Sequence, residues 1–279
     1  MKKTGMNKTN ISLLRKRILC LILLISAGFF VYISPKLFKD GLSSDQYREW
    51  FLPEKEPETV IVEIWHIAGF KPYTGSLSRW LENKAADFAN GYVGVYFNVK
   101  AYSPMEAEEQ LMRGSRPDII SFPDGAIYNV SYARPYCSTG DLVVYDPSAA
   151  IVKDLDELIQ NAAPVEQFKK GKASSCICDI RGAGDLYRAE LIGKCPYFEA
   201  EPIEGSLKKQ LIGVYNGIDQ NKIPYAESYI EYVLSVKSQS TICMLGLIPA
   251  ERSAKAEYEQ DWLKKLYESS LAASSPPPY

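Results

Sequence analysis

The chain has 279 residues, with 32 Lys and Arg, 34 Asp and Glu and a single histidine, so its formal net charge is −2 at neutral pH. Six of the basic residues precede residue 18, and removing them leaves 26 against 34 acidic residues, a formal charge of about −8 for the remainder. An acidic surface does not attract phosphate backbones, so no binding of nucleic acid is predicted.

The N-terminal region combines a basic leader at 1–17 with an uncharged, almost wholly apolar run at 18–33. That run is near the lower length limit for a membrane-spanning helix and also fits the core of a signal peptide. No clean small-x-small cleavage triplet follows it, which favours an uncleaved signal anchor over 18–34, with the basic leader in the cytoplasm. Either interpretation exports the rest of the chain. The polar segment at 35–57 is predicted to be a linker.

The next region, from Thr59 to Asp124, has the order strand, helix, strand, helix, strand. Period-two alternation of apolar residues predicts strands at 60–65 and 93–99. A helix with one buried face is predicted between them, because apolar residues recur at steps of three and four, at Leu77, Trp80, Leu81, Ala85 and Phe88. Trp80 is therefore expected in the core.

The second helix of this region has the strongest local signal. The segment Ser103-Pro104-Met105-Glu106 is a capping box with proline at the first helical position, and Gly114 is placed to end the helix. The third strand follows at 116–122. Short connections favour parallel pairing with right-handed crossovers, so the prediction is a βαβαβ half-sheet.

Ligands of open parallel sheets bind outside the carboxyl ends of the strands. We therefore expect one cleft there, lined by Trp65, His66, Ser76, Ser121 and Asp124.

Later in the chain, a helical end passes through Gly171 into an apolar strand, and the segment from Arg181 to Arg188 is predicted to be a turn that enters another helix. Its Gly-Ala-Gly lacks the third glycine of a dinucleotide-binding motif, so a simple turn is preferred to a phosphate loop. Pro224 is expected to begin a further helix, and Gly246-Leu-Ile-Pro249 to end that region.

Five cysteines lie beyond the apolar run, at Cys137, Cys176, Cys178, Cys195 and Cys243. They permit two disulfide bridges with one thiol left over, in a connectivity that spacing does not define. Cys176 and Cys178 are too close for the usual zinc knuckle, and alternate positions of a strand explain them better. Neither a metal nor a cofactor is predicted.

Several segments together resemble extracellular solute-binding proteins of family 1, the receptors of bacterial carbohydrate ABC importers, which include maltose-binding protein. The resemblance spans roughly 150 residues in the right order. It rests on the Ile-x-x-Trp-His strand, Gly-Ser before Trp-Leu-Glu-Asn, the run from Gly114 to Phe122, Phe168-Lys-Lys-Gly-Lys-Ala, Gly213-Val to Gly217-Ile, and Gly246-Leu-Ile-Pro249.

This resemblance implies a periplasmic-binding-protein-like α/β fold of the second type, with a solute held between two lobes and no enzymatic reaction. It adds Arg181, Asp185 and Tyr187 as second-lobe ligand contacts. It also implies a membrane-tethered, extracytoplasmic protein that captures a carbohydrate or similar polar solute for ABC permease subunits. The alternative is a degenerate surface or sensor-associated protein that binds another protein; an exported enzyme is disfavoured because a single histidine and no GxSxG or HExxH leave few mechanisms.

The predicted domains are a first lobe at 58–125 plus 205–268, a reduced second lobe at 126–204, and a disordered tail at 269–279. The second lobe is called reduced because only about 40 residues separate Gly125 from Glu166, where the family has a longer insertion.

Each candidate contact also has a structural interpretation. Trp65 could pack in the core, His66 could be a hydrogen-bonded structural histidine, and Ser76 could only cap its helix. Asp124 could form a turn with Gly125, and Arg181 with Asp185 could be a surface ion pair.

Overall fold

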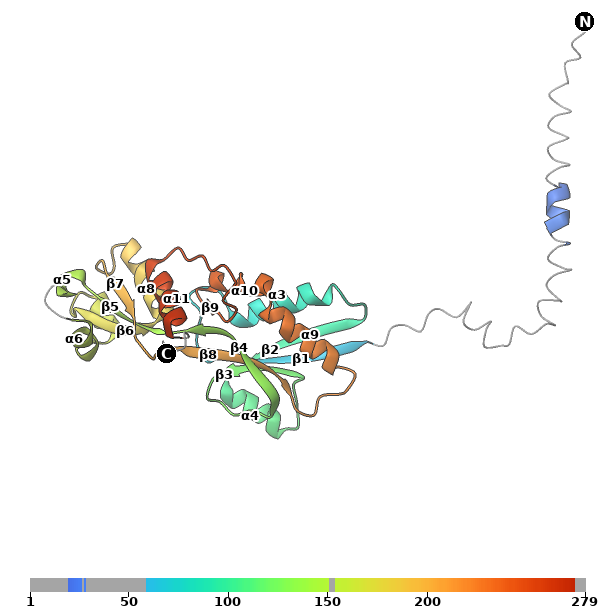
Figure 1. The fold of residues 1–279 in the computed structure, drawn as a ribbon, viewed down its shortest axis with the longest axis horizontal. Coiled ribbons are helices and arrows are strands. Elements are labelled where there is room, and N and C mark those ends of the chain that lie inside the picture. The colour runs from blue at the N-terminus through green and yellow to red at the C-terminus, as the bar shows by residue number, and fades with distance from the viewer. Residues whose placement is uncertain (1–19, 27, 29–58, 151–153, 274–279) are drawn as a thin grey trace, which may run out of the picture. The chain divides into compact units, whose positions relative to one another are not determined.

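The computed structural model describes residues 20–26, 28, 59–150 and 154–273, in two compact units, 1–58 and 59–279 (Figure 1). In the first unit, residues 20–26 are helical and exposed. Across the described residues no helix combines the length and the apolar character needed to cross a membrane. The predicted leader at 1–17, the linker at 35–57 and most of the anchor lie outside the described residues.

The second unit contains a six-stranded sheet in the order β2-β1-β3-β8-β4-β9. The strands are β1 (Val60–Ile67), β2 (Val95–Tyr102), β3 (Ile119–Pro123), β4 (Val130–Thr139), β8 (Lys208–Tyr215) and β9 (Ile248–Pro249). β1 pairs in parallel with both β2 and β3, whereas β8 runs antiparallel to β3 and β4, and β9 antiparallel to β4. The predicted βαβαβ half-sheet is confirmed.

Helices cover both faces of this sheet (Figure 1). One face packs against α3 (Leu77–Ala89) and α9 (Ile223–Leu234), and the other against α4 (Pro104–Met112). Alternation along β1 divides its residues between the two sides. Val62 and Ile64 belong to the larger core cluster and Trp65 and Ile67 to the cluster under α4.

Side-chain caps begin α3 and α4 as the sequence predicts. The Ser76 hydroxyl accepts a hydrogen bond from the Arg79 backbone N–H at the start of α3. At the start of α4, Ser103 and Glu106 form both hydrogen bonds of the capping box. Both caps satisfy backbone donors that a helix leaves unpaired.

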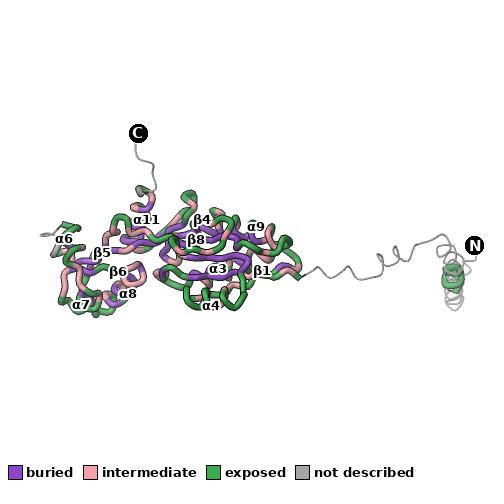
Figure 2. The backbone as a smooth tube through the Cα atoms, turned by 90° about the horizontal axis from the view of Figure 1, so that it is seen from below, coloured by how far each residue is buried: buried purple, intermediate pink, exposed green. Residues whose placement is uncertain are grey.

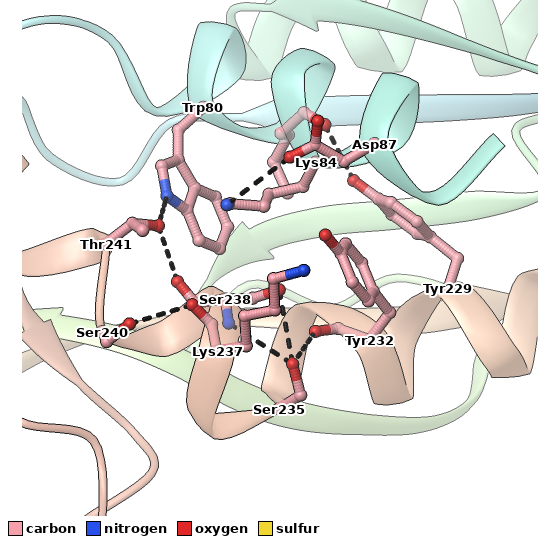
Figure 3. A network of polar contacts seen from close by, with 11 residues as sticks. Trp80, Lys84, Asp87, Tyr229, Tyr232, Ser235, Lys237, Ser238, Ser240 and Thr241 are labelled. Atoms are coloured by element: carbon pink, nitrogen blue, oxygen red, sulfur yellow. Dashed lines mark hydrogen bonds and ion pairs between the residues drawn. The ribbon is translucent and has the colours of Figure 1, made fainter. Parts of the chain in front are cut away.

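A group of polar contacts joins α3 to α9 and to Thr241, which follows α10 (Val236–Gln239) (Figure 3). The Trp80 indole donates to the Thr241 hydroxyl at 2.9 Å, and the Tyr229 hydroxyl donates to the Leu81 carbonyl at 3.0 Å. Trp80 is buried, which confirms its predicted place in the core.

A smaller antiparallel sheet, in the order β6-β5-β7, forms the second lobe. Its strands are β5 (Asp141–Tyr145), β6 (Ser175–Asp179) and β7 (Glu199–Pro202). The associated helices are α5 (Pro147–Ala150), α6 (Leu155–Gln160), α7 (Val165–Lys169), α8 (Ile180–Leu191) and α11 (Asp261–Ala273). In Figure 2 the buried backbone runs through the strands of both sheets, and exposed residues lie mainly in loops and outer helix faces.

The chain is divided between the two sheets differently from the predicted domains. β4 belongs to the large sheet, so the chain enters the small sheet after residue 140 rather than at 126. The last helix, α11, packs against β7 of the small sheet. Because α11 extends to residue 273, the first five residues of the predicted disordered tail are helical; residues 274–279 lie outside the described part of the chain.

The turn predicted at Arg181 is not present, because α8 starts directly after β6 with Asp179 as its cap. Both glycines of the segment therefore lie inside a helix. A Cβ at Gly182 would come 2.8 Å from the Cβ of Cys178, and one at Gly184 would collide with the Tyr73 ring. Close packing, rather than a turn, explains these glycines.

All six cysteines are free thiols, and all except Cys20 are buried. Cys176 and Cys178 occupy alternate positions of β6 and are both buried, which confirms the strand interpretation of that pair.

Candidate functional site

The carboxyl end of β1 separates two residues that the sequence analysis placed together. Successive side chains of a strand point to opposite faces, so Trp65 and His66 lie on different sides of the sheet. Trp65 is 2 % exposed and packs beside Tyr102 of β2, with ring centroids 5.0 Å apart. His66 points to the side of α3 and forms part of a cavity wall. Trp65 therefore packs in the core and does not line the cavity.

The cavity has a volume of about 510 Å³ and is bounded by the ends of β1 and β2, the loop after β1, the start of α3 and the cap residue of α4. Arg181 completes it from α8, so both lobes contribute to its wall. Its polar and charged lining is His66, Lys71, Ser76, Ser78, Ser103 and Arg181. Phe70 and Tyr102 add aromatic surface.

Other hollows of similar volume occur on the second lobe. One of about 500 Å³ lies between α8, β7 and α11 and includes Tyr187. It does not contain the end of any strand of the large sheet. We favour the cavity at His66 because it occupies the expected position at the carboxyl end of parallel strands and brings together three of the predicted residues.

Behind the cavity, a buried hydrogen-bond network holds His66. Its Nδ1 atom is 3.0 Å from the Ser121 hydroxyl, which in turn is 2.9 Å from the Tyr136 hydroxyl. The Gln210 amide nitrogen donates to Ser121 at 3.0 Å and to the Ile67 carbonyl at 2.8 Å. Four strands of the large sheet are thereby connected at one point.

Burial lowers the pKa of His66 to about 4. The physical cause is desolvation, because an imidazolium loses its hydration when only 3 % of the residue is exposed. At neutral pH the ring is therefore uncharged, and it can contact a solute as a hydrogen-bonding group but not as a cation.

The cations of the cavity are Lys71 and Arg181. The Arg181 guanidinium donates to the Tyr73 carbonyl at 3.2 Å. Neither side chain has an ion-pair partner within the described parts of the chain, and no described Asp or Glu lines the cavity. The wall consequently offers hydrogen-bond donors and positive charge in excess of acceptors.

The remaining predicted residues lie elsewhere. Ser121 is fully buried behind His66, where it positions the imidazole. Asp124 is exposed in the turn after β3, and its backbone N–H bonds to the Lys209 carbonyl. Asp185 forms an ion pair with Arg188 on the surface of α8, and Tyr187 faces the other cavity.

Sequence reasoning missed two aromatic residues of the wall, Phe70 and Tyr102, and five polar residues of the arrangement: Lys71, Ser78, Ser103, Tyr136 and Gln210. Ser103 was recognised only as the cap of α4. Its position directly after the carboxyl end of β2 was a signal that could have placed it in the cavity wall. Tyr136 and Gln210 reach His66 only through pairing of β4 and β8, which carries no local signal.

Comparison with solved structures identifies the fold. The cyclo/maltodextrin-binding protein complexed with maltotetraose aligns with a TM-score of 0.56 at 12 % identity, over 78 % of this chain and 86 % of that one. The unliganded maltodextrin-binding protein of L. casei gives 0.55 at 12 %, over 78 % and 86 %. The GacH receptor of Streptomyces glaucescens, solved unliganded and with acarbose, gives 0.54 at 13 %, over 78 % and 88 %.

At the level of sequence, no protein-family model matches the chain, and no curated protein matches it. The structural likeness nevertheless bears out the predicted architecture: this chain has the mixed α/β fold of sugar-binding ABC solute-binding proteins.

Proposed function

We propose that the protein is an extracytoplasmic solute-binding protein that captures a carbohydrate in the cavity at the end of β1. The observation that carries this proposal is the wall of that cavity, which combines His66 and Ser76 of the large-sheet lobe with Arg181 of the small-sheet lobe. A solute held there would contact both lobes. The similarity to maltodextrin-binding and acarbose-binding proteins supports a saccharide as the class of solute.

The lining suits binding rather than chemical conversion. Hydroxyls and cationic side chains can hydrogen-bond to sugar hydroxyls and ring oxygens, while aromatic surface packs against the apolar side of a pyranose. Phe70 and Tyr102 supply that aromatic surface. His66 is a neutral donor or acceptor fixed by Ser121. Solute capture needs only these contacts and movement of the two lobes around them.

The proposal includes a tether and a transporter. The basic leader followed by the apolar run at 18–33 supports an N-terminal membrane anchor with the 59–279 unit outside the membrane. ABC permease subunits are the proposed recipients of the solute, as a receptor of this fold would require.

A thermal-shift screen of the full-length protein against mono- and oligosaccharides tests the proposal, because a ligand that binds only the folded state raises apparent stability. We expect a concentration-dependent rise in Tm that Arg181→Gln reduces. Arg113→Gln is the matched control, since Arg113 lies at the far end of α4 and pairs with Glu109. Absence of any response to saccharides would reject solute capture and favour the alternative, a surface protein that recognises another protein.

A further inference from the structure

Residues from the starts of three helices line the proposed binding cavity. They are Ser76 at the cap of α3, Leu77 and Ser78 in its first turn, Ser103 at the cap of α4, and Arg181 in the first turn of α8. The N-terminus of a helix carries a partial positive charge and is a favourable place for an anion. The backbone therefore adds positive potential to the same space that Lys71 and Arg181 occupy.

Two of these helix starts are capped by a carboxylate, which offsets part of their positive potential. Asp179 caps α8, and Glu106 belongs to the capping box of α4, but neither lines the cavity. The first turn of α3 contains no acidic residue.

His66 supplies an independent observation, because the network behind it determines which ring nitrogen carries the proton. Gln210 is oriented by two backbone groups of fixed polarity. The Ile67 carbonyl can only accept, and the Gly69 N–H, 3.1 Å from the Gln210 Oε1 atom, can only donate. The amide nitrogen of Gln210 must then be the donor in its contact with Ser121.

Ser121 receives a second donor from Tyr136. The Tyr136 hydroxyl is fully buried, and within the described part of the chain its only hydrogen-bond partner is the Ser121 hydroxyl. An unsatisfied buried O–H is costly, so that proton points to Ser121. With two hydrogen bonds accepted, Ser121 donates its own proton to Nδ1 of His66.

The imidazole therefore carries its proton on Nε2. That nitrogen has no partner among the described residues, although the residue is 97 % buried, and the ring is part of the cavity wall. His66 consequently presents an N–H donor to the solute. It joins two cations without an ion-pair partner among the described residues and the start of α3, whose first turn has no acidic residue, and all of these favour an acceptor with negative charge.

We propose that the solute is an acidic saccharide, whose carboxylate binds among His66, Lys71, Arg181 and the start of α3. This inference rests on the proposed function and narrows its substrate class. A sugar carboxylate accepts several hydrogen bonds and balances the charge of the cavity, whereas the hydroxymethyl group of a neutral hexose leaves both cations uncompensated.

Matched ligands test the charge preference. Isothermal titration of the full-length protein would compare glucuronate with glucose and digalacturonate with galactobiose, pairs that differ only in the oxidation of C6. We expect the uronates to bind at least about tenfold more tightly, the scale of one charge-assisted hydrogen bond. Inorganic phosphate serves as the probe for binding of any anion.

Two variants test whether the preference for uronates arises from the two cations of the cavity. Arg181→Gln and Lys71→Gln should each reduce uronate affinity by about tenfold and hexose affinity by a smaller factor, and Arg113→Gln should change neither. Equal affinity for a uronate and its hexose would overturn the acidic-saccharide inference and leave solute capture standing. Phosphate binding as tight as uronate binding would also overturn it, and absence of all saccharide binding would reject the proposed function as well.

The position of the proton on His66 can be measured directly. Because the chain contains a single histidine, ¹⁵N-histidine labelling gives one pair of ring signals, provided that the protein is purified with a tag that lacks histidine. We expect a protonated Nε2 and an unprotonated Nδ1 at neutral pH, and a change in Nε2 on adding uronate. Tyr136→Phe removes one donor to Ser121 and should make the tautomers mix; a wild-type ring protonated at Nδ1 would refute the donor assignment.

Discussion

Acidification should destabilise the folded protein through His66. Burial lowers its pKa from 6.5 to about 4, so between these values the unfolded chain binds a proton that the folded chain does not. The free energy of unfolding must therefore fall as the pH drops below 6.5 and level off below about 4. A difference of about 2.5 in pKa corresponds to about 3 kcal/mol, a large fraction of the stability of an ordinary domain.

Urea denaturation followed by tryptophan fluorescence measures this effect, with His66→Gln as the reference. Carboxyl groups titrate in the same range, but they do so in both proteins, so the difference between wild type and variant isolates the histidine. We expect the wild type to lose about 3 kcal/mol more than the variant between pH 6.5 and 4. Parallel pH profiles for the two proteins would refute the claim that His66 is held neutral by burial.

Three substitutions test the fold around the site. Gln210→Leu removes the side-chain partner of two backbone groups and one of the three partners of the Ser121 hydroxyl, and it should cost about 3 kcal/mol in urea denaturation. Lys209→Met, at the exposed neighbouring position, should change stability by less than about 0.5 kcal/mol. Ser103→Ala removes the cap of α4 and should cost about 1 kcal/mol, measured in the same way. Gly246→Ala should lower the Tm by several degrees. Gly246 has a φ of 73°, and a Cβ atom there would come 2.5 Å from the Cβ atom of Tyr73. An unchanged Tm would contradict the left-handed turn.

The first half of the large sheet was predictable because its signals are local. Alternation defines β1 and β2, and the caps at Ser76 and Ser103 define the starts of α3 and α4. Short connections then require parallel neighbours. Each of these inferences uses residues within about one helix length of each other.

The assignment of β4 and α11 to their sheets was not predictable in the same way. β4 contacts β8 across more than 60 residues of sequence, and two irregularities in register interrupt that pairing. The helical glycines of α8 were misleading for a related reason. Position 184 requires glycine because the ring of Tyr73, over 100 residues earlier, packs against it. From the sequence alone, such a glycine is interpreted as part of a turn.

Three of the residues proposed from the sequence line the candidate cavity, and the proposed set is incomplete. His66, Ser76 and Arg181 do meet in one cavity. Trp65 was included because it is adjacent to His66 in sequence, although the alternation of Val62 and Ile64 already assigned the two neighbours to opposite faces. Strict use of that period would have removed Trp65 from the list.

The position of His66 explains why this residue type suits the end of β1. A neutral imidazole accepts a hydrogen bond at one nitrogen and donates at the other. Because Ser121 donates to Nδ1, the N–H at the cavity wall is on Nε2. A lysine would bring a charge whose desolvation this buried position would penalise, and a leucine would leave Ser121 without an acceptor. Since Gln210 takes its orientation from the backbone of the β1 end itself, the same segment that carries His66 also determines which hydrogen-bonding group the histidine offers to a solute.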